Sequence, residues 1–184
     1  MNIEKKTIYK DEELLRTPSK DVNFNNTKYT RYIKLLKKFC NDAGCTAVSG
    51  VQIGIPERII YAGFDKGMVF INPSIESAKG EASSWEDNIS CGDNIGLVKR
   101  PFEILVKFFN EDLEEYIEIF QGEQAAILCQ QIDLTNGILF TDVAEEVQNQ
   151  PEKRRIIIKN NSPYQIISQT SDCIVNKSFV RAKK

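Results

Sequence analysis

Hydrophobic residues recur at spacings of three and four in two stretches of the chain, and this period predicts two amphipathic helices. The first covers about residues 26–42 and the second about residues 124–134. Gly44 and Gly137 follow these stretches and are suited to end them, because glycine readily adopts the left-handed conformation of a helix C-cap. A shorter helical turn is predicted at Asp11–Arg16.

Short apolar runs bounded by turn residues predict β-strands. Pro73 follows the second run and is expected to end it, because proline cannot donate to a strand ladder. The pattern predicts an α+β fold, with short antiparallel sheets around the buried helix at 124–134. With no repeat or linker to divide it, residues 1–184 are expected to form a single domain. The predicted strands are Arg58–Gly63, Met68–Asn72, Ile104–Asn110, Glu115–Phe120, Ile156–Ile158 and Tyr164–Ser168.

Charge and hydropathy narrow the class of protein. The 184 residues include 24 Lys and Arg and 26 Asp and Glu, and this balance favours neither nucleic acid nor a membrane surface as a partner. No apolar run approaches the roughly 20 residues of a transmembrane helix, and the first residues lack the apolar segment of a signal peptide. A cytoplasmic protein is therefore expected.

Histidine is absent, which excludes Ser–His and Cys–His nucleophile pairs and a histidine-ligated zinc. The number of cysteines is odd, and no two form a C-x-x-C pair, which argues against a disulfide framework and a four-cysteine zinc site. Free thiols in a reducing compartment are the expectation. The five cysteines are Cys40, Cys45, Cys91, Cys129 and Cys173.

Three segments resemble, in order and spacing, the motifs of the peptide deformylases, metal hydrolases that remove the formyl group from new N-terminal methionines. The family motifs are G-x-G-x-A-A-x-Q, E-G-C-L-S and Q-H-E-x-D-H-x-x-G. The corresponding segments are C-T-A-V-S-G-V-Q at 45–52, E-D-N-I-S at 86–90 and C-Q-Q-I-D-L-T-N-G at 129–137. The resemblance runs from about Leu14 to Asp142. Residues 151–184 carry no family signal and form a divergent C-terminal segment.

The resemblance implies a site for Fe²⁺, Zn²⁺ or Ni²⁺ on two histidines of a helix and one cysteine, but this chain departs from it. Gln130 and Leu134 stand at the histidine positions and Asn88 at the cysteine position. None supplies the imidazole or thiolate of a tight transition-metal site. Gln131 stands at the general-base position, and its amide has no useful proton-accepting pKa. No metal cofactor is therefore expected. A replacement site on Cys91 and Cys129 would lack a third good ligand.

Other family roles are implied for residues that remain. Gln52 and the backbone N–H of Ile89 match the groups that hold the developing oxyanion, although Gln52 equally suits a polar residue that binds a strand backbone. Ile95 replaces an arginine that contacts the peptide. Asp133 is expected to make an internal salt bridge or cap. The peptide pocket maps to residues that a hydrophobic core would also explain, namely Thr46, Ala47, Ile89, Ala126 and Ile127.

Three functional hypotheses remain at this point. The first is a catalytically inactive homologue, retained to bind N-terminal peptides or to regulate another protein. The second is a working peptide deformylase with an unorthodox site. The third is an interaction domain whose partner surface lies on residues 151–184. The sequence leaves the partner and the oligomeric state open.

Overall fold

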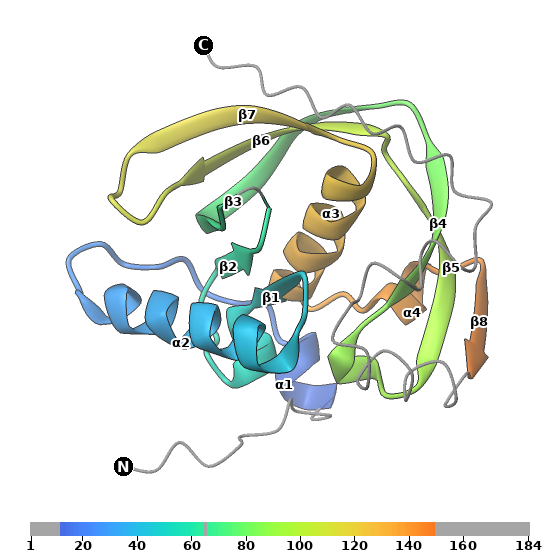
Figure 1. Ribbon diagram of the computed structural model, residues 1–184, viewed down its shortest axis with the longest axis horizontal. Coiled ribbons are helices and arrows are strands. Elements are labelled where there is room, and N and C mark those ends of the chain that lie inside the picture. Colours follow the sequence, from blue (N-terminus) through green and yellow to red (C-terminus); the bar gives the residue numbers. More distant parts are fainter. Residues whose placement is uncertain (1–11, 65, 150–184) are drawn as a thin grey trace.

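The computed structural model describes residues 12–64 and 66–149 (Figure 1). The predicted strands Ile156–Ile158 and Tyr164–Ser168 and the divergent segment 151–184 lie outside the described residues. Two sheets are present, one of five strands in the order β1-β2-β3-β6-β7 and one of three strands in the order β4-β5-β8. The strands are β1 (Ala47–Ser49), β2 (Ile59–Ala62), β3 (Met68–Lys79), β4 (Ala82–Asp87), β5 (Asn94–Arg100), β6 (Glu103–Phe109), β7 (Glu115–Gln121) and β8 (Glu146–Asn149).

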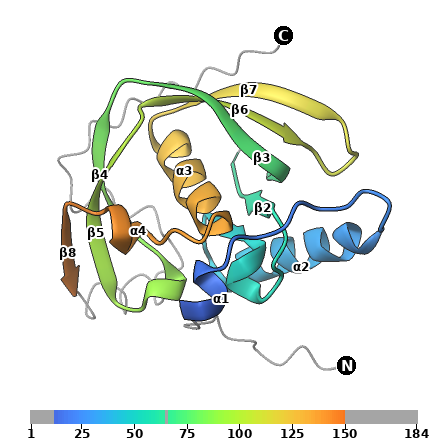
Figure 2. The same cartoon turned by 180° about the vertical axis from the view of Figure 1, so that it is seen from behind.

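Helices fill the space between and beside the sheets (Figures 1 and 2). None of those in the described residues is long and apolar enough to cross a membrane. They are the α-helices α1 (Glu12–Arg16), α2 (Lys28–Ala43), α3 (Glu123–Thr135) and α4 (Phe140–Val143), and the short 3₁₀ helices η1 (Gly50–Ile53) and η2 (Ile89–Cys91).

The helix α3 lies between the two sheets in both views (Figures 1 and 2). Its apolar side chains join the main core cluster, where Leu128 and Ile132 pack with Phe70, Phe108 and Phe120 of the five-stranded sheet. All pairings between named strands are antiparallel in the described ranges. The predicted α+β arrangement, with short antiparallel sheets around one buried helix, is confirmed.

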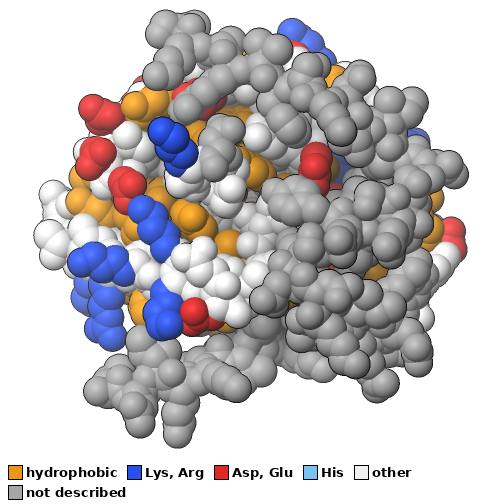
Figure 3. Space-filling view, in the orientation of Figure 1, with side chains coloured by type: hydrophobic (Ala, Val, Ile, Leu, Met, Phe, Trp, Pro, Cys, Tyr) orange, Lys and Arg blue, Asp and Glu red, His pale blue; other side chains and the backbone are white. Residues whose placement is uncertain are grey.

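The helix α2 covers the other side of the five-stranded sheet with one apolar face. Ile33 and Leu36 are buried there against β2 and β3, while Lys34 and Lys38 point outward. Blue side chains gather over α2 on the lower left of Figure 3, so the outer surface of this helix is basic. The helix ends at Gly44, in the left-handed conformation with φ of 63°, as the sequence predicts.

The prediction that a strand ends at Pro73 is wrong. The strand β3 continues through this proline to Lys79. Its register against β6 shifts between the Ile71 and Ser74 pairings, and Asn72 has a φ of 51°. Such a bulge lets a strand carry a residue without a backbone N–H. The strand thereby extends as far as the second sheet. The hydrophobic pattern did not predict the strands β4 and β5 of that sheet.

Substituting Gly137 with alanine is expected to destabilise the fold more than the same change at Gly44. Both glycines have left-handed φ angles, 78° and 63°, which cost an alanine about 1–2 kcal/mol. A Cβ at Gly137 would also run into the backbone carbonyl of Arg16, whereas one at Gly44 would meet no atom within 4 Å. Urea unfolding of the two variants measures the difference, and equal losses would contradict the expectation.

Candidate functional site

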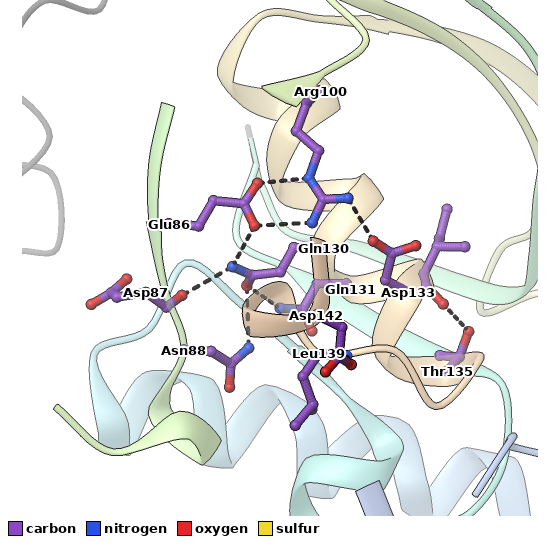
Figure 4. A network of polar contacts seen from close by, with 11 residues as sticks. Glu86, Asp87, Asn88, Arg100, Gln130, Gln131, Asp133, Thr135, Leu139 and Asp142 are labelled. Carbon is purple, nitrogen blue, oxygen red and sulfur yellow. Dashed lines mark hydrogen bonds and ion pairs between the residues drawn. The ribbon is translucent and has the colours of Figure 1, made fainter. Parts of the chain in front are cut away.

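Four carboxamide side chains from three separate segments meet where the two sheets approach α3. Gln52 comes from η1, Asn88 precedes η2, and Gln130 and Gln131 lie on the last turns of α3. We call these four residues the amide cluster. Figure 4 shows three of them, Asn88, Gln130 and Gln131, side by side below the Arg100 guanidinium.

Hydrogen bonds connect the amide cluster into one chain. Gln52 Nε2 donates to Asn88 Oδ1 at 3.0 Å, and Asn88 Nδ2 donates to Gln130 Oε1 at 3.2 Å. Gln131 Nε2 donates to the same Gln130 oxygen at 3.3 Å. Each amide thus uses a neighbouring amide as its partner, and the acceptor oxygens of Asn88 and Gln130 are occupied.

Two members of the cluster are also fixed by local backbone contacts. Asn88 Oδ1 accepts from the N–H of Ser90 at 2.8 Å, which caps the N-terminus of η2. Gln52 Oε1 accepts from the N–H of Ser49, the last residue of β1, at 2.9 Å. Gln52 thus binds the backbone at the end of β1 through its oxygen and Asn88 through its amide nitrogen.

Gln130 connects the amide cluster to a buried group of charges. Its Nε2 donates to Glu86 Oε2 at 3.1 Å and to the backbone oxygen of Asp87 at 3.0 Å (Figure 4). Arg100 holds Glu86 with two hydrogen bonds, of 2.7 and 3.0 Å, and Asp133 with a third of 2.5 Å. We call Glu86, Arg100 and Asp133 the charge triad.

The charge triad is largely shielded from solvent. The side chains of Arg100 and Glu86 are 8% and 7% exposed, and that of Asp133 is 23% exposed. Burial raises the pKa of Asp133, and the hydrogen bond from Arg100 opposes this shift. Asp133 makes the internal salt bridge that the sequence predicts. Sequence reasoning gave Arg100 no role, although the presence of a buried acid on α3 was a signal for a basic partner.

Gln131 has one unsatisfied polar atom. The residue is 3% exposed, and its Oε1 has no hydrogen-bond partner in the described part of the chain. A buried acceptor left unpaired costs about 1–3 kcal/mol, so such atoms are uncommon in folded proteins.

Leu134, one helical turn after Gln130 on α3, is fully packed. It is 1% exposed and contacts the apolar cluster of Leu15, Val51 and Leu139. Cys91 packs against this same group, whereas Cys129 belongs to the main core and its burial raises its pKa to about 12. Within residues 12–64 and 66–149, no three His, Cys, Asp or Glu side chains are placed to hold a metal ion.

The side chains at the three positions that match the ligand positions of the resembled motifs do not fit a transition metal. Leu134 has no donor atom, and the amides of Asn88 and Gln130 are neutral and engaged with each other. Iron, zinc and nickel sites in proteins are built from imidazole, thiolate and carboxylate groups. The two amides hydrogen-bond to each other, so their polar atoms have partners without a metal ion.

The residues predicted to line a peptide pocket fall into two groups. Ala47 is buried in the main core and Ile127 packs against that core, so these two residues contribute to the hydrophobic core. Thr46, Ile89 and Ala126 remain half-buried. Ala126 and Ile127 lie one helical turn before Gln130 and Gln131, so the pairs share faces of α3. Ile95 is half-buried on β5, paired with Asp87.

Comparison with known proteins shows which family the sequence of this chain resembles. A family model described as polypeptide deformylase matches residues 5–150. A peptide deformylase of Prosthecochloris aestuarii is 31% identical over 144 residues, covering 74% of this chain and 77% of the relative. Peptide deformylase 2 of Clostridium acetobutylicum is 28% identical over 138 residues, covering 74% and 92%.

Solved structures share the fold at lower identity. The peptide deformylase of Thermotoga maritima has a TM-score of 0.73 and 20% identity, covering 79% of this chain and all of that one. The Met-Ala-Ser-bound peptide deformylase of Acinetobacter baumannii has a TM-score of 0.72 and 22% identity, covering 78% and 99%.

Proposed function

Because the chain belongs to the peptide deformylase family, we propose that it is a non-catalytic member that works without a metal and binds N-terminal peptide segments. The observation that carries the proposal is the amide cluster. Side chains at the former metal and general-base positions bind one another, and Leu134 is packed into an apolar cluster. The proposed location is the cytoplasm, and the proposed partners are peptides rather than nucleic acids or membranes.

The loss of catalysis follows from the chemistry of the cluster. Hydrolysis of a formamide needs an activated water and a group that takes up its proton. The carboxamide of Gln131 neither accepts a proton near neutral pH nor moves one between reacting atoms. Asn88 and Gln130 supply no ligand charge that would hold a metal ion and lower the pKa of water bound to it.

The proposal that the chain binds peptides rests on one polar atom and two apolar side chains at the same site. Among residues 12–64 and 66–149, Gln131 Oε1 is a buried acceptor without a hydrogen-bond partner, and a peptide N–H would satisfy it. Half-buried Ile89 and Ala126 provide apolar surface nearby on η2 and α3. The relative from A. baumannii was solved with Met-Ala-Ser bound, and this tripeptide is therefore the first ligand to test.

The test of lost catalysis uses the full chain purified without chelators. Elemental analysis is expected to find iron, zinc and nickel far below one ion per chain. Formyl-methionyl peptides are expected to release no formate above a heat-denatured control, with or without these metals added. About one ion per chain, together with turnover that a chelator abolishes, would overturn the proposal in favour of the alternative, a working deformylase with an unorthodox site.

The test of peptide binding uses calorimetric titration with Met-Ala-Ser and its formylated form. Gln131→Leu is expected to weaken binding about 2- to 10-fold, because one hydrogen bond is worth about 0.5–1.5 kcal/mol. The same change is expected to raise stability, because it removes a buried unpaired oxygen. Gln124→Leu, in the half-buried first turn of α3, is the matched control. No binding of either peptide by the folded wild-type chain would reject this part.

A further inference from the structure

Two cysteines, Cys40 and Cys45, meet at the point where α2 turns into β1. Their Sγ atoms lie 3.4 Å apart, and the Cys45 thiol donates to Cys40 Sγ. Cys40 Sγ in turn donates to the carbonyl oxygen of Cys45 at 2.6 Å. The sulfurs of a disulfide are about 2.05 Å apart, so a small movement would bring this pair to bonding distance.

Backbone hydrogen bonds at the end of α2 bring the two cysteines together. The N–H of Cys45 donates to the carbonyl of Cys40 at 3.1 Å, and that of Gly44 donates to the carbonyl of Asn41 at 3.3 Å. These two bonds, with Gly44 in the left-handed conformation, are the Schellman pattern of a helix C-terminus. The pattern turns the chain back on the helix, and the residues on either side of the turn face each other.

The two thiols differ in access. Cys45 is half-buried, whereas Cys40 is 3% exposed and packs with Leu36, Val48 and Ile59. The hydrogen bond between the two thiols lowers the pKa of Cys40, where burial opposes the effect, and raises the pKa of Cys45, where burial acts in the same direction. Access, and not acidity, therefore sets the order in which the two sulfurs react. An external reagent therefore reaches Cys45 first, and Cys40 lies behind it as the second sulfur.

We propose that Cys40 and Cys45 are a redox-active dithiol, which a small-molecule disulfide such as oxidised glutathione converts to an intrachain disulfide. The Cys45 thiolate attacks the glutathione disulfide, forms a mixed disulfide and releases one glutathione thiolate. The Cys40 thiolate then attacks Cys45 Sγ and releases the second glutathione. The two protein thiols lose two protons and two electrons, and glutathione disulfide accepts them as two glutathione thiols.

The other described cysteines are not placed for this reaction. Cys91 packs beside Leu134, and Cys129 lies in the main core, so the two belong to different apolar clusters. The dithiol lies at the entry to β1 and η1, and a Cys40–Cys45 bond would fix the turn that leads to Gln52. Since the folded chain holds the sulfurs together, the oxidised protein is expected to unfold at a higher temperature than the reduced protein.

The test equilibrates the full reduced chain in glutathione redox buffers, with and without denaturing urea, followed by alkylation and trypsin digestion. Trypsin cleaves after Lys38 and after Arg58 and so releases residues 39–58 as one peptide that contains both cysteines. An intrachain disulfide makes this peptide lighter by two hydrogens and protects it from alkylation. The effective concentration of one thiol toward the other is expected to be at least tenfold higher in the folded chain than in urea.

Two variants complete the test. Cys45→Ser is expected to abolish the intrachain product, and Cys91→Ser, the matched control, is expected to leave it unchanged. The comparison of folded with unfolded wild-type chain needs no variant, so a misfolded Cys45→Ser protein would not remove the test. Equal effective concentrations in buffer and urea, or a mixed glutathione disulfide as the main oxidised form, would overturn the proposal.

Discussion

Four substitutions made together are expected to give this chain a metal site that none of them gives alone. The changes are Asn88→Cys, Gln130→His, Gln131→Glu and Leu134→His. Residues 130 and 134 are one turn apart on α3, so two imidazoles would share one face of the helix. Asn88 hydrogen-bonds to Gln130 at 3.2 Å, so a thiolate at position 88 would lie beside them. Elemental analysis after loading with nickel or zinc is expected to give about one ion per chain.

The matched control is Gln131→Glu by itself, which is expected to bind no metal and to release no formate. Groups that act on one chemical step are not additive, so restoring one of them returns almost nothing. The fourfold variant is also expected to be a slow enzyme, because Ala47 and Ile95 leave the peptide poorly positioned. Turnover by the single variant would contradict this expectation, because it would show that the chain holds a catalytic metal without the other three substitutions.

Substituting Arg100 with methionine is expected to lower the free energy of unfolding by about 3–5 kcal/mol. The change leaves Glu86 and Asp133 buried without the cation that both of them bind. An uncompensated buried charge costs far more than the loss of a hydrogen bond. Urea unfolding monitored by circular dichroism measures the loss.

Two controls separate the effect of charge from the effect of packing. Adding Glu86→Gln and Asp133→Asn to the Arg100 variant removes the two charges and is expected to recover a large part of the lost stability. Lys38→Met breaks the exposed pair with Asp42, whose side chains are both 63% exposed. Pairs of this kind are worth less than about 1 kcal/mol. A loss at Arg100 no larger than that at Lys38 would contradict the importance of the charge triad.

The sequence by itself determined the elements whose hydrophobic period is strong. The helices α2 and α3, with their closing glycines, follow from it, as do β2, β6 and β7. The strands β4 and β5 were missed because serines and charged residues interrupt their apolar positions, for example at Ser83 and Lys99. The end of β3 was misplaced because only pairing with β6 shows that the strand bulges around Pro73 and continues.

The contacts at the site were decided by the tertiary structure. The sequence showed that Gln52, Asn88 and Gln130 stand at motif positions, but they are 36 and 42 residues apart. Their hydrogen bonds arise only when η1, η2 and α3 pack together. The pairing of Arg100 with both Glu86 and Asp133 also depends on the approach of β4, β5 and α3.

For the cysteines too, the sequence and the three-dimensional structure determine different things, although the two residues are close in the sequence. The sequence contained five cysteines without a C-x-x-C pair, and free thiols were the natural expectation. Cys40 and Cys45 are only five residues apart, yet their spacing alone does not place the two sulfurs in contact. The left-handed turn at Gly44 reverses the chain and brings them to 3.4 Å. Local composition set which residues could react, and the backbone conformation decided which of them meet.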